Sequence, residues 1–172
     1  MMIRIENSTD YEMVKEVIKR AFSKTEQLNH TEYDLVNRLR VSGAFVPNLS
    51  LVYEQDNKII GQIMFSKVRV GKGELLALAP ISVDPVYQNQ GIGSALVEAG
   101  IELAKKLGYK GIVVIGPQSY YSRFGFRKAA EFNIKSPFDI PEESYLILEL
   151  SNNALQPMSG VVEYSKAFQS EM

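Results

Sequence analysis

The first forty residues have the apolar spacing of two amphipathic helices. A capping pair, Thr9 with Glu12, precedes the first helix, and a second pair, Thr31 with Asp34, precedes a shorter one that Gly43 would end. The apolar stripe of the first helix consists of Val14, Val17, Ile18, Ala21 and Phe22. Both patterns predict helices that bury one face.

Strand-like spacing appears at residues 3–5 and again in three segments, 49–54, 59–70 and 74–83, which polar turns separate. The three segments predict a three-strand meander. The last of them is apolar on both faces, so we expect it in the middle of a sheet.

Helical spacing returns at residues 94–107, where Lys105 and Lys106 fall in the last turn and Gly108 follows as a cap. A buried strand is predicted at 111–116, and a short helical turn comes after it. This part of the chain therefore alternates strand, helix and strand.

Two later segments, 145–150 and 160–165, again have strand-like spacing. The order of elements predicts a mixed α/β fold in which helices pack on a sheet. We expect one domain over residues 1–172, with a core at about 3–150 and a C-terminal strand extension at 151–172. At this length the chain buries roughly 70% of its unfolded surface and needs no disulfide or metal to stabilise it.

Composition excludes several kinds of chemistry. The chain has no Cys, which rules out thiolate metal sites and cysteine nucleophiles, and its one histidine, His30, rules out a histidine-rich metal site. The net charge is -1 without any Lys/Arg block, so we expect no nucleic-acid partner. The longest charge-free stretches have 13 residues, short of the roughly 20 of a membrane helix, and Glu6 and Asp10 interrupt any signal peptide. We expect a cytoplasmic protein without a membrane partner.

A glycine-containing loop leads into the helix at 94–107. It reads Gln88-Asn-Gln-Gly91-Ile-Gly93 and follows the strand at 74–83. The first turn of a helix has free backbone N–H groups and the positive end of the helix dipole, which makes it an anion site. The two glycines leave room for a diphosphate to approach, and they would equally suit a tight turn.

Two other phosphate-binding motifs fit this loop poorly. A P-loop requires a Lys followed by Ser or Thr, and no Lys lies here. The dinucleotide fingerprint GxGxxG has Leu96 at its third glycine position, and the seven residues from Asp84 to Gln90 separate it from its strand. A dinucleotide-binding domain is therefore the weaker alternative.

The pattern Gln-x-x-Gly-x-Gly at 88–93, after a strand that ends in PISVDP, resembles the loop of the GNAT superfamily of acetyl-CoA-dependent N-acetyltransferases. A second segment, Tyr121-Ser-Arg-Phe-Gly125-Phe126, is similar to the Tyr-x-x-x-Gly-Phe signature of that family. HTEYDLVNRLR, LALAPISV and SYYSRFGF further resemble the YhbS-like subgroup. The resemblance covers residues 3–150 and implies a central mixed, mostly antiparallel sheet with splayed parallel strands and flanking helices.

The resemblance also implies acetyl-CoA as co-substrate and no metal. The diphosphate would lie on the loop, and the pantetheine amides would pair with the end of the strand at 74–83, where it splays from the strand at 111–116. The Val83 N–H would polarise the thioester carbonyl. The cofactor-binding residues expected on this basis are Ile81, Ser82, Val83, Gln88, Asn89, Gln90, Gly91, Ile92, Gly93, Ser94, Tyr120 and Phe124.

Tyr121 matches the family's general acid for the departing CoA thiolate. A thiol of pKa about 8.5 is more acidic than a tyrosine of pKa about 10, so we expect mainly hydrogen-bond stabilisation of the thiolate. Core packing is the alternative role for Tyr121, and it is the favoured one for its neighbour Tyr120. Arg123 is either solvated or close to the adenine.

The acceptor must also lose a proton. An alkyl amine of pKa about 10.4 is mostly protonated near pH 7.4, and exposing its lone pair costs about 4 kcal/mol. Glu32 is the first candidate base, with Glu26, His30 and Asp34 as further candidates, although a first-turn carboxylate also suits the helix dipole. The LALAPISV segment contains no acidic residue that could serve instead.

The leading hypothesis is an N-acetyltransferase in which a primary amine attacks acetyl-CoA directly in a ternary complex. The alternative from another class is a non-catalytic acyl-CoA-binding sensor or interaction module, and Tyr121 favours the enzyme. The acceptor would be a small-molecule or peptide amine, which a fold alone does not identify. We expect a monomer or homodimer.

Overall fold

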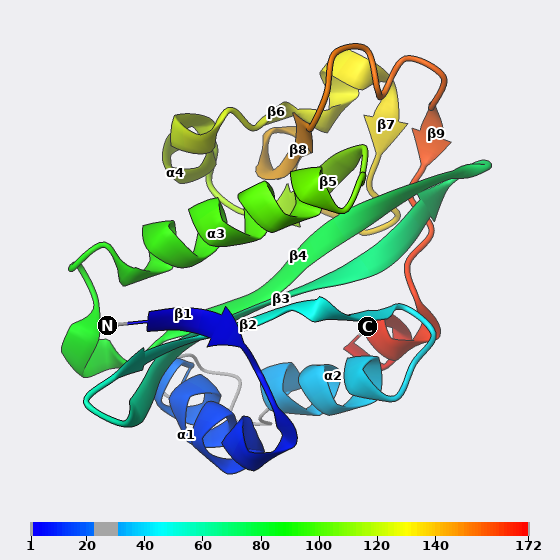
Figure 1. Ribbon diagram of the computed structural model, residues 1–172. Helices are drawn as coiled ribbons and strands as arrows, with labels where there is room; N and C mark the ends of the chain where they lie inside the picture. Colours follow the sequence, from blue (N-terminus) through cyan, green and yellow to red (C-terminus); the bar gives the residue numbers. More distant parts are fainter. Residues whose placement is uncertain (1, 23–30, 172) are drawn as a thin grey trace.

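A twisted sheet runs through the middle of the molecule. In this computed structural model α3 (Ile92–Lys106) lies over one face, and α1 (Tyr11–Ala21) and α2 (Thr31–Arg40) lie under the other (Figure 1). The structure describes residues 2–22 and 31–171. The strands in these ranges are β1 (Met2–Ile5), β2 (Phe45–Gln55), β3 (Lys58–Val70), β4 (Gly73–Val83), β5 (Gly111–Ile115), β6 (Arg127–Lys128), β7 (Ile134–Lys135), β8 (Tyr145–Glu149) and β9 (Gly160–Val161).

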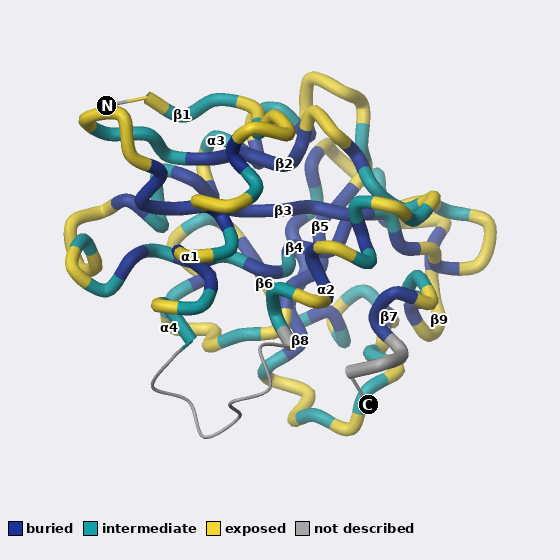
Figure 2. The backbone as a smooth tube through the Cα atoms, turned by 90° about the horizontal axis from the view of Figure 1, so that it is seen from below, coloured by how far each residue is buried: buried dark blue, intermediate teal, exposed yellow. Residues whose placement is uncertain are grey.

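The described strands of the main sheet follow the order β1-β2-β3-β4-β5-β8-β6, and β7 pairs with β9 in a small separate sheet. Antiparallel pairing dominates the main sheet, and β4 and β5 form a parallel pair. The predicted mixed, mostly antiparallel sheet is confirmed. β4 has three strands on each side, as its two apolar faces predict, and β3 beside it is buried along most of its length (Figure 2).

The start of α1 differs from the sequence-based prediction. Asn7 caps a 3-10 turn, Ser8–Asp10, that leads into α1: its side chain accepts a hydrogen bond from the Thr9 N–H at 3.0 Å, and the Asp10 carboxylate accepts one from the Asn7 N–H at 2.9 Å. Asp10 is also the cap position of α1 itself, where it makes no side-chain capping hydrogen bond. Arg4 of β1 donates to both oxygens of Asp10 and thereby lowers the pKa of that carboxyl group. The predicted capping pair of Thr9 with Glu12 is wrong, since the ion pair with β1 places the capping carboxylate at Asp10.

The end of α2 also differs from the prediction, and the end of α3 agrees with it. α2 ends at Arg40, and Gly43 does not adopt a left-handed conformation. Ser42 caps this helix instead, because its hydroxyl donates to the Leu39 carbonyl at 2.8 Å. At the end of α3, Gly108 has the left-handed conformation of a helix cap (φ 85°).

The C-terminal segment contains less strand than its pattern predicts. Only Gly160 and Val161 are in β9, so the strand predicted at 160–165 is wrong beyond residue 161. There the chain leaves β7 and exchanges two backbone hydrogen bonds with Arg69 of β3 through Glu163. The residues that follow pack beneath the sheet beside α1 and α2. None of the helices in the described part of the chain has the length and apolar character needed to cross a bilayer.

Gly100 lets α3 approach the sheet closely. A Cβ atom at this position would lie 2.2 Å from the ring of Phe65, which is fully buried in β3. Since overpacking costs about 1–3 kcal/mol and alanine regains about 1 kcal/mol of helix propensity, Gly100→Ala should lower the free energy of unfolding by up to about 2 kcal/mol. Urea denaturation measures this change. Gly43→Ala, where the added Cβ meets nothing within 4 Å, is the control, and equal losses in both variants would contradict the packing.

Candidate active site

The loop between β4 and α3 ends at a helix N-terminus whose first backbone N–H groups have no intrahelical acceptor. Gly91 caps α3 in a left-handed conformation (φ 84°) and provides no side-chain hydrogen bond. The Ala95 N–H donates to the Gly91 carbonyl at 3.0 Å, so the N–H groups of the three preceding residues lie before the first intrahelical bond. The first turn contains no acidic side chain. The loop therefore offers an anion both N–H donors and the positive end of the helix.

Next to this loop, β4 and β5 diverge. They pair at only two positions, Leu76 with Ile112 and Ala77 with Val113. Beyond Ala77, β5 keeps pairing with β8 on its other side. The edge of β4 from residue 78 to its end therefore has no strand partner among the described residues.

The backbone groups at this open edge are oriented for binding. The Asp84 N–H donates to the Ile60 carbonyl at 2.8 Å, so the neighbouring pair of Gly61 with Val83 is of the non-hydrogen-bonded type. The N–H and C=O of Val83, and by the same alternation those of Ile81, consequently point away from β3. The side-chain amide of Gln88 donates to the Val83 carbonyl at 3.0 Å. An extended chain of amides could pair with the N–H of Val83 and with the N–H and C=O of Ile81.

A cavity of about 600 Å³ joins the loop to this edge of β4. Most of the residues predicted to bind a cofactor line it, and two further lining residues, Tyr87 and Arg123, were not on that list. The predicted residues that line it are Ile81, Val83, Gln88, Asn89, Gly91, Ile92, Gly93, Ser94 and Tyr120.

Three predicted residues lie outside the lining. Ser82 is buried, and its hydroxyl accepts a hydrogen bond from the Gln62 side chain at 2.9 Å. Gln90 is exposed at the tip of the loop. Phe124 packs against the ring of Tyr120, with 5.4 Å between the ring centroids, and so supports the wall from behind.

Tyr120 forms part of the cavity wall. Its hydroxyl lies 3.2 Å from the hydroxyl of Ser94 in the first turn of α3. The guanidinium of Arg123 stacks over its ring at 4.5 Å and also donates to its carbonyl at 3.0 Å. This arrangement holds a cation in the same cavity as the N-terminus of α3.

Tyr121 is buried next to Tyr120, with 4.9 Å between the centroids of their rings, and it is not among the residues that line the cavity. It is 6% exposed, and its ring lies edge-on to Phe126, with 5.5 Å between the centroids. Gly116, which the sequence-based prediction missed, makes room for this ring, because a Cβ there would lie 2.5 Å from it. Burial raises the pKa of Tyr121 to about 12, and Tyr120 adds to the rise. The phenol is therefore a neutral hydrogen-bond donor over the whole physiological range.

The predicted bases do not converge on this cavity. Glu32 is half-buried in the first turn of α2, on the face of the sheet opposite α3 (Figure 1), and it is not part of the lining. Asp34 is exposed on the same helix. Glu26 and His30 lie outside the described residues.

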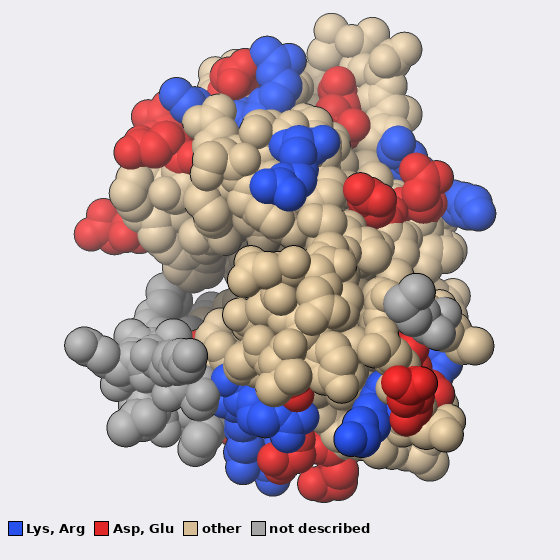
Figure 3. Space-filling view, turned by 90° about the vertical axis from the view of Figure 1, so that its left-hand side faces the viewer, with Lys and Arg blue, Asp and Glu red and all other residues tan. Residues whose placement is uncertain are grey.

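The surface around the site is weakly charged. Figure 3 shows the side of the molecule on which α3 begins, where uncharged surface occupies the middle and groups of both signs lie around it. Across residues 2–22 and 31–171, no three His, Asp or Glu side chains gather as a metal site requires. The site thus offers backbone donors, one arginine and two tyrosines to a ligand.

Comparison with known proteins identifies the family of this chain. The family model "Acetyltransferase (GNAT) family" matches residues 11–126. The N-acetyltransferase YhbS of Escherichia coli K12 is 31% identical over 170 residues, which is 98% of each chain, and YjhQ of the same organism is 33% identical over 90% of this chain and 86% of its own.

Solved structures agree in fold. The E. coli YhbS structure in complex with CoA matches 98% of this chain and 91% of that chain with a TM-score of 0.89. A GNAT family acetyltransferase from Brucella melitensis in complex with acetyl-CoA matches 97% of each chain with a TM-score of 0.79 and 31% identity. With an anion loop, diverging central strands and a match over most of its length, this chain belongs to the GNAT family of acetyltransferases.

Proposed function

We propose that this protein transfers the acetyl group of acetyl-CoA to a primary amine, which attacks the thioester directly in a ternary complex. The observation that carries the proposal is the cavity that joins the free N-terminus of α3 to the unpaired edge of β4. One end of this cavity suits a diphosphate and the other suits a chain of amides. The relatives solved with CoA and with acetyl-CoA support the same ligand here.

The diphosphate would lie on the first turn of α3. Gly93 faces the cavity there, since a Cβ on it would come within 3.5 Å of the Tyr120 hydroxyl and 3.7 Å of the Val83 side chain. Its missing side chain leaves the space that a phosphate needs. Arg123 supplies the positive charge from the opposite wall.

The pantetheine arm would continue along β4. Val83 is next to the loop, and Ile81 is two residues deeper between the strands. The thioester is farther from the diphosphate than the pantetheine amides are, so we assign the amides to Val83 and the thioester carbonyl to the Ile81 N–H. This order reverses the one expected from sequence, in which Val83 polarises the carbonyl.

Tyr121 is proposed to stabilise the departing thiolate. The amine nitrogen attacks the carbonyl carbon, the C–N bond forms, the C–S bond breaks, and the proton lost by the amine ends on the thiol. A phenol of pKa about 12 does not transfer its proton to a thiolate whose conjugate acid has a pKa of about 8.5, so it acts by donating a hydrogen bond. Glu32, on the face of the sheet opposite α3, stays the candidate base for the amine.

Thermal denaturation with added nucleotides tests the cofactor assignment. A ligand at about 100 times its dissociation constant stabilises the folded state by about 2.7 kcal/mol, which raises Tm by about 5–10 °C for a chain of this size. CoA and acetyl-CoA should both do so. NAD and ATP, which share the adenine and phosphates but lack pantetheine, are the controls. Equal shifts with all four would contradict binding along β4.

A further inference from the structure

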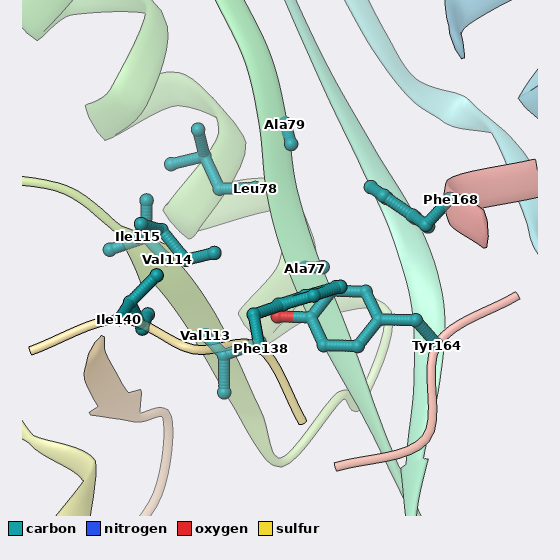
Figure 4. A pocket seen from close by; sticks show the side chains of 10 residues that line it. All are labelled: Ala77, Leu78, Ala79, Val113, Val114, Ile115, Phe138, Ile140, Tyr164 and Phe168. Carbon is teal, nitrogen blue, oxygen red and sulfur yellow. The ribbon is translucent and has the colours of Figure 1, made fainter. Parts of the chain in front are cut away.

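A second cavity lies where β4 and β5 begin to diverge. Residues 77–79 of β4 and 113–115 of β5 form its walls, beginning at the last paired residues, Ala77 and Val113 (Figure 4). Two of the three β4 side chains are alanines, which leave the space open. The cavity has a volume of about 280 Å³.

Aromatic and aliphatic side chains close this cavity. Phe138 and Ile140 come from the segment between β7 and β8, and Tyr164 and Phe168 come from the C-terminal segment (Figure 4). The Tyr164 ring lies edge-on to Phe138, with 4.8 Å between their centroids, and to Phe168, with 5.0 Å. These contacts define the closing wall of the cavity.

The described residues of the lining include no charged side chain. The one polar side-chain group among these described residues, the Tyr164 hydroxyl, lies 2.8 Å from the hydroxyl of Tyr145 and is hydrogen-bonded to it. Burial raises the pKa of Tyr164 to about 12, so this wall stays neutral. The space is larger than an apolar cavity of about 150 Å³ that is known to hold benzene. It suits a hydrocarbon chain of several carbons.

β4 connects this cavity to the one at the loop. Val83 and Ile81 line the loop cavity, and Ala79 lines the apolar one. Val83 and Ala79 are four positions apart along β4, which is at most about 13 Å, and the pairing of β4 with β3 shifts register between them. A pantetheine arm that follows this edge from the loop would deliver its thioester to the mouth of the apolar cavity.

We propose that the apolar cavity holds the hydrocarbon chain of an acyl-CoA donor longer than acetyl-CoA, a short- to medium-chain fatty acyl-CoA. The inference rests on the proposed function, because it requires CoA to bind along β4. The protein then transfers the longer acyl group by the same step, with the C–N bond formed, the C–S bond broken and CoA released as the thiol.

The lining favours an acyl chain over the body of the acceptor. An amine arrives mostly as a cation, and burying a cation without a carboxylate partner is costly. Among residues 2–22 and 31–171, no Asp or Glu lines this cavity to offset that cost. An acyl chain is neutral, and it is already attached to the group that reaches the cavity mouth.

Titration calorimetry with CoA, acetyl-CoA, butyryl-CoA, hexanoyl-CoA and octanoyl-CoA tests the inference without any acceptor. Each buried methylene contributes about fourfold in affinity at full burial, so butyryl-CoA, with two more methylenes, should bind about 15-fold more tightly than acetyl-CoA. The gain should continue with chain length and level off when the cavity is full.

Two variants change the space in opposite directions. Ala79→Leu fills the mouth, so the butyryl-to-acetyl affinity ratio should fall from about 15 to about 1. Phe138→Ala removes part of the closing wall, so the gain in affinity with acyl chain length should level off only at longer chains. Ala154→Leu, the same enlargement at a half-buried loop position outside the cavity, should leave the ratio unchanged.

The outcomes separate the inference from the function on which it rests. If the protein binds CoA and acetyl-CoA but gains nothing from longer chains, the inference is overturned and the cavity is left for an apolar part of the acceptor. If it binds no CoA at all, the proposed function fails and the inference fails with it.

Discussion

Gly93→Glu should abolish most of the affinity for acetyl-CoA without unfolding the protein. The new carboxylate would point into the cavity that we assign to the diphosphate, since a Cβ there faces Tyr120 and Val83. Two like charges about 5 Å apart repel by about 3 kcal/mol at an effective dielectric constant of about 20, which corresponds to a loss of about 100-fold or more. Titration calorimetry measures the loss directly.

The fold should tolerate this change. Gly93 does not have the left-handed conformation of Gly91, and an acidic residue in the first turn of a helix interacts favourably with its dipole. Gly93→Gln, which has nearly the same shape without the charge, should lose less affinity, and Gly43→Glu at an open position should lose none. Unchanged affinity in Gly93→Glu would show that the diphosphate binds elsewhere.

Tyr121→Phe should bind acetyl-CoA normally and transfer acetyl about 10- to 100-fold more slowly. The substitution keeps the ring that packs against Phe126 and removes only the hydroxyl. Positioned proton transfer is typically worth at least about 100-fold, and a hydrogen bond to the thiolate falls near or below that value. An interaction made mainly in the transition state lowers kcat and kcat/KM together. Steady-state kinetics on an amine that the wild type acetylates measures both.

Tyr120→Phe is the matched control for Tyr121→Phe. Its hydroxyl contacts Ser94 at the helix N-terminus, so its loss should weaken cofactor binding more than turnover.

The pKa of Tyr121 is raised to about 12, so the phenol stays protonated at every pH below about 10. Any fall in rate as the pH is lowered from about 10 must therefore come from another group. Full turnover in Tyr121→Phe would remove the role that we assign to this hydroxyl.

The loop and helix of the site could be predicted because their signals are local. α3 runs over 92–106 where the apolar stripe predicts 94–107, and the glycines of the loop lie at the cavity. The capped 3-10 turn that leads into α1 could not be predicted, because the segment ENSTD offers several capping residues and a contact with Arg4 decides among them.

Other features depend on packing between distant parts of the chain. Tyr120 and Tyr121 are adjacent on a one-turn helix, and only the position of Gly116 shows which of them turns into the core. The apolar cavity depends on Tyr164 and Phe168 reaching β4 from the far end of the chain. A strand-like pattern at 160–165 contains no information about that contact.

Acceptor-dependent acetyl transfer is the most direct test of the central claim. The purified protein is incubated with acetyl-CoA and a panel of small-molecule and peptide amines, and release of free thiol is followed together with the mass of each amine. We predict that free thiol is released only when an amine is present and that the amine gains the mass of one acetyl group. At the same acetyl-CoA concentration, the Gly93→Glu variant should release much less thiol. Tight acetyl-CoA binding without transfer to any amine of the panel would contradict the account.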